Sequence, residues 1–394
     1  MSPRISLIIP TYNTKDYIAI CLESCINQSF RDIEILIIDD CGNDGAIDIA
    51  KSYAKRDSRI RIIRNSQNLG TFAARIEGIK HAKGAYICFI DADDYIESKM
   101  CEVLEQTLLA HKEPDIIHFN IHYKGNKKTS LLANAAHKLR YILPIGLSLK
   151  PLSNTNIAYN FFLKNYHFPK FTLWDKCFKS TLLKQTLPLI QTYIPLKLIM
   201  AEDMLHFFII SLLAKSYVGI NARLYVYCLN HISITQNKAK VEKKILDMRH
   251  IIQALHTLAK ELVAHNPLAP KIAKIMGNNL GSLMILESRF YTPQHYGMNN
   301  KINRGGGKAN IAPRYNTYSS ITPCRAKPYC SLKASAILHR HLFALYALLH
   351  TILAVLESLP YLYPSKCIYP KLYTYQALST PTPHFILLRQ SNAA

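Results

Sequence analysis

Short apolar runs and segments with helical spacing alternate along the first ninety residues. The runs are Ser6 to Pro10, Ile33 to Ile38, Arg59 to Arg64 and Tyr86 to Ile90. The segments between them are Asp16 to Ile26, Ala46 to Ala54 and Thr71 to His81. The first run is apolar after Ser6, the last is apolar throughout and Ile33 to Ile38 is apolar except at Glu34, as in strands buried on both faces of a parallel sheet. Strands that alternate with helices in units of roughly 25 residues predict βαβ crossovers and a mixed, mostly parallel α/β sheet flanked by helices.

Polar side chains follow three of the predicted strands directly. They are Thr11 and Asn13, then Asp39 and Asp40, then Asp91, Asp93 and Asp94. Ligands of a parallel sheet bind outside the carboxyl ends of its strands, so we expect these clusters to converge on one crevice. Ionised carboxylates beside a buried strand are costly unless something pairs with them, and Mg²⁺ or Mn²⁺ prefers such hard oxygen ligands. The run Asp91-Ala-Asp-Asp94 therefore predicts a divalent cation site with open positions for a diphosphate.

Each motif also has a simpler structural interpretation. A polar loop would account for the acids after Ile90. An Asx turn with a helix cap would account for Asn43 to Gly45, although it leaves the adjacent acids Asp39 and Asp40 unexplained. The expected convergence of three clusters is thus stronger evidence than any one motif.

Five motifs follow one another in a recognisable order and spacing. They are Pro10-Thr-Tyr-Asn13, Ile38-Asp-Asp-Cys-Gly-Asn-Asp-Gly45, Asn68-Leu-Gly70 with Arg75, Ala82-Lys-Gly84 and Phe89-Ile-Asp-Ala-Asp-Asp94. In these motifs the chain resembles the family 2 glycosyltransferases of the GT-A fold, over roughly its first 230 residues and most specifically over the first hundred. The resemblance implies an inverting hexosyltransferase of the kind that builds bacterial cell-surface polysaccharide or lipopolysaccharide.

The resemblance also implies roles for single residues. The nucleotide-sugar site would contain Thr11, Tyr12, Asn13, Asp40, Arg75 and Asp91, with Pro10, Asp39, Asn68 and Gly70 as further candidates. Asp40 would read the base and Asp91 would contact the ribose. Asp93 would hold the Mn²⁺ or Mg²⁺ that bridges to the diphosphate, with Asp94 beside it. For Arg75, a basic residue facing the nucleotide, a plain surface arginine is the alternative.

A second acidic motif, Glu202-Asp203, opens an apolar helical run. Acids in the first turn of a helix often serve only the cap and the helix dipole. The family, however, keeps a Glu-Asp pair at this point, so the resemblance implies that Asp203 is the general base. Inverting transfer needs a carboxylate that takes the proton of the acceptor hydroxyl.

Two later segments match the family less closely. Thr172 to Lys179 contains Trp174 and resembles the segment before the helix that carries the base, with a core aromatic as the alternative. Leu224 to Thr235 resembles the segment that closes the catalytic domain, but Cys228 stands where the family has an arginine. This departure argues against a phosphate contact from that loop.

The positive charge lies in the second part of the chain. Residues 1–110 hold 13 Lys and Arg against 16 Asp and Glu, and the remainder holds 35 against 10, for a net charge of +22. A basic surface of this size suits a polyanion, either nucleic acid or an anionic membrane face. The lysine clusters adjoin apolar helices instead of alternating with aromatic residues, which favours the membrane over nucleic acid.

Composition divides the chain into four parts. We expect a catalytic domain at 1–236, a helical extension at 237–298, a flexible Gly-, Asn- and Pro-rich linker at 299–330 and an apolar, Tyr-rich segment at 331–394. The uncharged run Leu342 to Leu356 in the last part is too short for a membrane span. Its Tyr and Lys neighbours predict an interfacial anchor, and a helix packed on the catalytic domain is the alternative.

No signal peptide is visible before Ile5, and the ten cysteines form no Cys-x-x-Cys pair. These features predict a cytoplasmic protein with reduced thiols. The basic second part adds the expectation that the protein is peripheral on the cytoplasmic face of the inner membrane. The leading hypothesis is a metal-dependent transferase that uses a nucleotide-sugar, UDP-linked, and a glycan or lipid-linked acceptor. The alternatives are a nucleotidyltransferase, a basic nucleic-acid-binding protein and an inactive relative. The sequence gives no indication of oligomeric state.

Overall fold

The computed structural model describes residues 2–125, 146–164, 171–195, 197–229 and 240–289. The expected linker and C-terminal segment, at 299–330 and 331–394, lie outside these ranges. One mixed sheet occupies the centre, with strand order β3-β2-β1-β4-β8-β6-β9-β5 and β7 paired to β9. The strands are β1 (Ile5–Thr11), β2 (Ile33–Asp39), β3 (Ile60–Arg64), β4 (Tyr86–Phe89), β5 (Tyr95–Ile96), β6 (Ile116–Lys124), β7 (Leu152–Ser153), β8 (Lys176–Lys179) and β9 (Ser216–Cys228). The half formed by β3, β2, β1 and β4 is parallel throughout, as the alternating pattern predicted.

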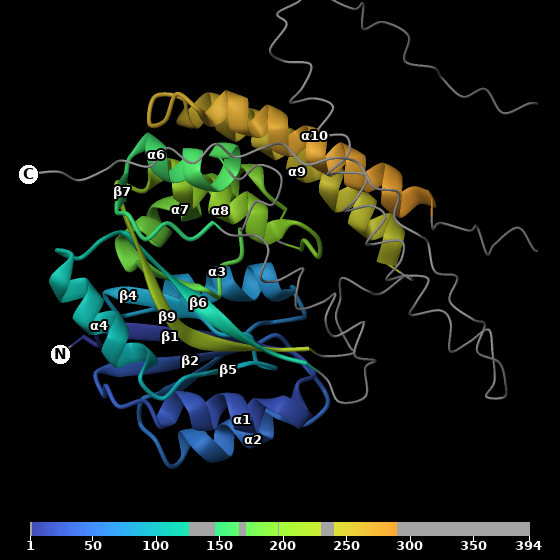
Figure 1. Cartoon of the computed structure of the whole chain (residues 1–394). Helices are drawn as coiled ribbons and strands as arrows, with labels where there is room; N and C mark the ends of the chain where they lie inside the picture. The colour runs from blue at the N-terminus through green and yellow to red at the C-terminus, as the bar shows by residue number, and fades with distance from the viewer. Residues whose placement is uncertain (1, 126–145, 165–170, 196, 230–239, 290–394) are drawn as a thin grey trace, which may run out of the picture.

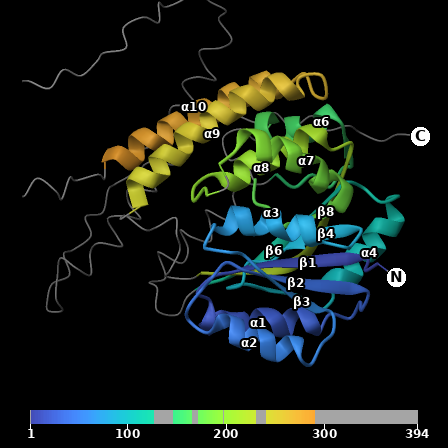
Figure 2. The same ribbon diagram turned by 180° about the vertical axis from the view of Figure 1, so that it is seen from behind.

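Helices cover both faces of the sheet (Figures 1 and 2). They are α1 (Lys15–Ile26), α2 (Ala46–Ala54), α3 (Thr71–His81), α4 (Met100–Ala110), α6 (Thr155–Ala158), the π-helical η1 (Tyr159–Lys164), α7 (Ser180–Tyr193), α8 (Glu202–Leu213), α9 (Val241–Leu262) and α10 (Ala269–Arg289). α1 and α2 lie on one face, whereas α3 lies on the other with α7 and α8 beyond it. α9 and α10 form an outermost antiparallel pair in both views.

The continuous apolar strands are explained by burial on both faces. Ile8 and Phe89 point into the core under α3, and their neighbours Ile9 and Cys88 point into the core under α1. This two-residue alternation leaves no solvent-facing side on β1 or β4, and the polar Ser6 of β1 is buried as well, where its hydroxyl donates to Glu34.

Two helices, α9 and α10, lie within the range expected for the helical extension. Met248 and Leu255 of α9 and Ile272 of α10 belong to the same apolar core as Leu205 of α8. The extension therefore packs on the helical layer next to the sheet, and the domain boundary at 236 stays a prediction. Within the described ranges, every helix is too short or too polar to cross a bilayer.

Candidate active site

Three strands end side by side at one edge of the sheet. Pro10 and Thr11 end β1, and Thr11 lies opposite Asp39 of β2. The Asp40 amide donates to the Thr11 carbonyl at 3.0 Å. On its other side β1 pairs in parallel with β4, which brings Asp91 to the same edge. The polar clusters expected to converge at the carboxyl ends of the strands do lie together.

The loops after β1 and β2 contact each other. Asn13 has a φ of 50°, in the left-handed region that asparagine tolerates. Its Oδ1 accepts a hydrogen bond from the Asn43 amide at 2.9 Å. A Cβ at Gly42 would lie 2.8 Å from the Asn13 nitrogen, so glycine is required for this close approach. Tyr12 is 47% exposed, which leaves its ring accessible to a ligand.

The two adjacent acids at the end of β2 make different hydrogen bonds. Asp39 Oδ1 accepts the Cys41 amide at 2.9 Å, which is an Asx turn. Asp40 is buried, and its two oxygens accept the amides of Leu69 and Gly70 at 2.9 and 2.8 Å. Asp40 thus ties β2 to the loop before α3. Its expected contact with a base stays a prediction.

Arg75 of α3 lies between two carboxylates. Its Nη1 contacts Asp203 Oδ1 at 2.5 Å and its Nη2 contacts Asp91 Oδ1 at 2.8 Å. Only 4% of the side chain is exposed, so the alternative of a plain surface arginine is wrong. Burial opposes the charge, but Asp203 and Asp91 together raise the pKa of Arg75 above its ordinary value. The guanidinium therefore stays charged and joins the two acids.

The acidic pair Glu202-Asp203 begins α8. Ala201 before it has a φ of 60°, a left-handed conformation that is unfavourable for alanine. Burial and the neighbouring Asp203 raise the pKa of Glu202 to about 7. Burial also raises the pKa of Asp203 against the opposing attraction of Arg75. Two acids with raised pKa values beside a buried cation are typical of a functional site.

Residues of β9 form hydrogen bonds with the acidic turn after β4. Tyr225 donates its hydroxyl hydrogen to Asp94 Oδ2 at 2.7 Å, and its oxygen accepts the Asp91 amide at 3.1 Å. The Cys228 amide donates to Asp94 Oδ1 at 2.7 Å. Burial and the nearby charges of the acidic run raise the pKa of Asp94 well above its ordinary value. Asp94 therefore has a structural role: its hydrogen bonds to β9 fix the turn that contains Asp91 and Asp93.

Asp93, like Asp91, is a partly exposed carboxylate of this turn. Three or more potential protein ligands do not gather around one point anywhere in the described part of the chain. A single carboxylate nevertheless suits Mg²⁺ or Mn²⁺, which are often held by one or two carboxylates and the oxygens of a substrate diphosphate. The donor set therefore fits a cation that arrives with its nucleotide, and Asp93 remains the predicted ligand.

Trp174 lies beneath the site. It is buried and stacks on Tyr225 with ring centroids 5.0 Å apart and an interplanar angle of 26°. This is the core aromatic that the alternative interpretation described. Its position behind Tyr225 means that it supports the Asp91–Asp94 turn from within the core.

Asp247 is a buried acid next to the segment before α8, and it was not among the residues predicted from the sequence. It lies on α9, and its Oδ2 accepts the Ile199 amide of the segment before α8 at 2.8 Å. A signal was present, because Lys244, Asp247, Met248 and Ile251 follow helical spacing and put two charged residues on a buried face.

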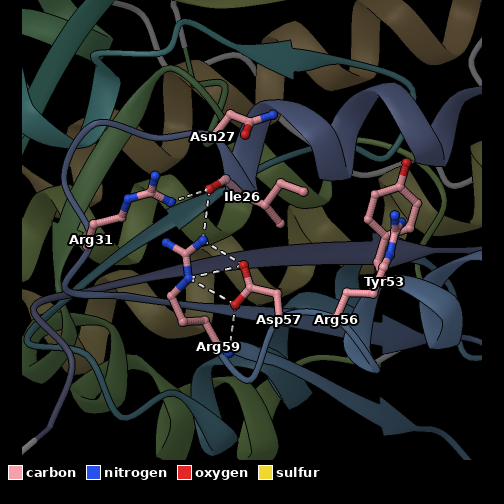
Figure 3. A pocket seen from close by; sticks show the side chains of 7 residues that line it. All are labelled: Ile26, Asn27, Arg31, Tyr53, Arg56, Asp57 and Arg59. Carbon is pink, nitrogen blue, oxygen red and sulfur yellow. Dashed lines mark hydrogen bonds and ion pairs between the residues drawn. The ribbon is translucent and has the colours of Figure 1, made fainter.

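A pocket at the opposite edge of the sheet holds a second group of charges (Figure 3). It is lined by Ile26, Asn27, Arg31, Tyr53, Arg56, Asp57 and Arg59. Arg59 donates to both oxygens of Asp57, with Nη2–Oδ2 at 2.6 Å, and to the Ile26 carbonyl at 2.8 Å. Because these bonds join the end of α1 to the start of β3, we interpret this group as a structural contact that stabilises the fold.

Residues 6–182 match the family described as Glycosyl transferase family 2. The chain is 44% identical over 116 residues to the putative glycosyltransferase EpsH of Bacillus subtilis (strain 168), covering 29% of this chain and 33% of that protein. It is 28% identical over 269 residues to the putative teichuronic acid biosynthesis glycosyltransferase TuaG of the same organism, covering 64% of this chain and 90% of that protein. The chain spans about a third of the first curated relatives, 33% and 30% of their lengths. The solved structure of S. aureus TarS 1–349 in complex with UDP is similar at a TM-score of 0.47 and 21% identity, covering 64% of this chain and 65% of that one.

Proposed function

Because the chain belongs to glycosyl transferase family 2 through residues 6–182, we propose that it is an inverting glycosyltransferase. Its donor would be a nucleotide-diphosphate sugar, UDP-linked, and its acceptor a hydroxyl of a glycan or lipid-linked intermediate. The product would enter cell-envelope polysaccharide or lipopolysaccharide. TuaG, whose name refers to teichuronic acid biosynthesis, supports a cell-surface polymer as the product class.

The observation that carries this proposal is the ion-pair cluster of Arg75, Asp91 and Asp203. Asp91 follows β4 at the edge where a nucleotide would bind, and Asp203 lies in the first turn of the helix α8. Arg75 contacts both, so one guanidinium sets the spacing between the donor side and the expected base. A reaction between two bound substrates needs this kind of fixed spacing, because orientation alone supplies a large share of the rate.

In this mechanism Asp203 accepts the proton of the acceptor hydroxyl as that oxygen attacks the sugar carbon and the diphosphate leaves from the opposite face. A carboxylate with a raised pKa is a stronger base than an ordinary one, and Arg75 keeps it ionised. The position at the start of α8 also favours the anion. A divalent cation on Asp93 would supply positive charge to the leaving diphosphate.

Titration of UDP by calorimetry, with and without Mn²⁺, tests the donor site. We expect binding that needs the metal and is lost in Asp93→Ala, while Asp48→Asn, which changes an exposed acid of α2, binds like the wild type. Transfer from a panel of UDP-sugars should then fail in Asp203→Asn with UDP affinity unchanged. If no nucleoside diphosphate binds the wild-type protein, the proposal is wrong.

We also propose that the protein is peripheral on the cytoplasmic face of the inner membrane. The excess of 35 basic over 10 acidic residues after residue 110 supports this location, since each basic residue near an anionic surface adds about 1 kcal/mol. Flotation with anionic and neutral liposomes tests it, with a nucleic-acid gel shift in parallel. Binding to nucleic acid without binding to anionic liposomes would exclude the membrane proposal.

A further inference from the structure

Asp247 of α9 links the helical extension to the segment that precedes the expected base. The residue is completely buried. Its Oδ2 accepts the Ile199 amide at 2.8 Å, and its Oδ1 pairs with Lys243 one helical turn earlier. Lys243 in turn donates to the Lys197 carbonyl at 2.8 Å. Two charged side chains of α9 therefore hold the main chain at Lys197 and Ile199.

The held segment leads directly to Asp203. Leu198 is buried in the apolar core that also contains Met248 of α9. Ala201 then turns the chain into the left-handed region, at a φ of 60°, and α8 begins at the next residue. Such a conformation persists only where surrounding contacts impose it. The direction in which Asp203 leaves this turn thus depends on contacts that include those from α9.

The same segment touches the donor side of the site. A Cβ on Gly70 would lie 3.6 Å from the Leu198 carbonyl oxygen, so the two main chains are close neighbours. Gly70 is itself held by Asp40, at 2.8 Å from its amide to the carboxylate. The segment before α8 is therefore fixed from two sides, by the loop tied to β2 and by α9.

Docking of α9 by itself does not require a carboxylate. The face of α9 that meets α7 and α8 is apolar at Met248, Ile251 and Leu255. Removing a carboxylate from water is costly unless its partners are well placed, and an apolar residue would pack there at lower cost. The ion pair between Lys243 and Asp247 lies within α9, so it does not by itself explain why the acid is buried against the segment before α8. The Ile199 amide is the partner that does.

We propose that Asp247 is a positioning residue that aims Asp203 by fixing the segment between Lys197 and Ala201. The inference rests on the proposed function, in which Asp203 is the base. It assigns a part in the reaction to a helix outside residues 6–182, the segment that matches the family. It also makes the transfer rate depend on how the helical extension is docked.

The test compares Asp247→Asn and Asp247→Ala in the full chain. The asparagine keeps the size and one acceptor oxygen but loses the ion pair, whereas the alanine loses both. We expect kcat to fall by about tenfold and about a hundredfold, with the donor KM changed by less than about twofold. We also expect faster hydrogen exchange of the amides from Ile199 to Asp203 in the alanine variant, measured by mass spectrometry.

Asp115→Asn is the matched control. Asp115 lies before β6, at the sheet edge opposite the site, and accepts the amides of Lys215 and Ser216 at 2.7 and 3.2 Å. This variant should lose a similar main-chain contact with kcat unchanged. If Asp247→Ala keeps the wild-type kcat, or loses kcat only as much as Asp115→Asn does, the positioning role is wrong.

The outcomes separate this inference from the proposed function. Transfer by the wild type that is abolished in Asp203→Asn supports the base, whatever Asp247 does. A wild-type protein without transferase activity on any donor refutes the proposed function. In that case, loss of amide protection confined to residues 199–203 in Asp247→Ala still supports the structural link, and unchanged protection there overturns it.

Discussion

Arg75 and Asp203 form an ion pair of 2.5 Å across 128 positions of sequence. Arg75 comes from α3, next to the parallel half of the sheet, and Asp203 from the first turn of α8. The second nitrogen of the same guanidinium contacts Asp91 at 2.8 Å. Arg75 lies within residues 6–182, the segment that matches the family, and Asp203 lies beyond it. The ion pair therefore connects the matched segment to a later part of the chain.

Arg75→Lys keeps the positive charge but removes the forked geometry. A lysine ammonium is a point charge and is unable to span Asp91 and Asp203 as the guanidinium does. We expect the unfolding free energy to fall by about 1–3 kcal/mol, because one partly buried carboxylate loses its partner. The transfer rate should fall by at least about tenfold. Urea unfolding and steady-state kinetics measure the two effects.

Arg61→Lys is the control for this change. Arg61 of β3 pairs with Glu34 at 2.8 Å, but its side chain is 33% exposed. Arg61→Lys keeps the charge, and water screens an ion pair whose cation is partly exposed, so we expect a loss within about 1 kcal/mol and wild-type kinetics. Equal transfer rates in Arg75→Lys and the wild type would show that the bridge has no part in the reaction.

Glu202→Gln should change how stability depends on pH. In the folded protein, burial and then Asp203 raise the pKa of Glu202 to about 7 from 4.5. The folded state therefore keeps a proton that the unfolded state has lost, and the unfolding free energy falls as the pH rises from 4.5 to 7. The full effect is about 3 kcal/mol at most. The glutamine variant lacks this loss and should be more stable than the wild type at pH 8 and similar to it at pH 4.5.

Urea unfolding at several pH values measures this difference. Glu242→Gln changes an exposed acid in the first turn of α9 and should leave the pH dependence as it is in the wild type. A gap between Glu202→Gln and the wild type that is the same at pH 4.5 and pH 8 would contradict the assignment, because a titrating group produces a gap that grows with pH.

The parallel half of the fold could be predicted from the sequence. A strand buried on both faces has few polar positions. The apolar composition of Ile33 to Ile38 alone therefore predicts that this strand lies inside the sheet with both faces covered. The same holds for the acids at the strand ends, since topology alone brings Thr11 beside Asp39. The local sequence pattern was sufficient to predict those residues whose place in the fold depends only on burial and on strand direction.

The contacts between the acids and their partners were not predictable from local pattern. Arg75 shares the helical spacing of the buried residues Phe72 and Ile79 on α3, but that spacing does not show that Asp203 of the distant helix α8 is its partner. Tyr225 reaches Asp94 because β9 pairs with β5 immediately after the acidic turn. Asp247 of α9 accepts the amide of Ile199, which lies in the segment before α8. Each contact depends on how distant elements pack, which the spacing of residues does not indicate.

Asp40→Asn distinguishes two roles for this buried acid. The asparagine has one acceptor oxygen, so it is unable to accept the amides of Leu69 and Gly70 as the two carboxylate oxygens do. If Asp40 also reads the base, the variant should change the ratio of affinities for UDP and other nucleoside diphosphates. If it acts only through the loop, all nucleotides should bind about equally more weakly, by roughly tenfold. Calorimetric titrations with UDP, GDP and CDP measure this ratio.

Tyr225→Phe tests whether the turn that carries Asp91 and Asp93 is held from β9. The hydroxyl donates to Asp94 at 2.7 Å and accepts the Asp91 amide at 3.1 Å, so its loss leaves two polar groups without this partner. We expect about 1–3 kcal/mol less stability and UDP binding in Mn²⁺ weakened by about tenfold.

Tyr217→Phe separates the binding effect from the loss of stability. Tyr217 is equally buried on the same strand, and its oxygen accepts the Ser148 amide at 3.0 Å. Because Tyr217 lies at the other end of β9, its variant should lose similar stability and bind UDP as the wild type does. A loss of UDP affinity in Tyr217→Phe as large as that in Tyr225→Phe would attribute the effect to general loosening of the sheet. A loss confined to Tyr225→Phe would attribute it to the acidic turn, because only that hydroxyl reaches Asp91 and Asp94.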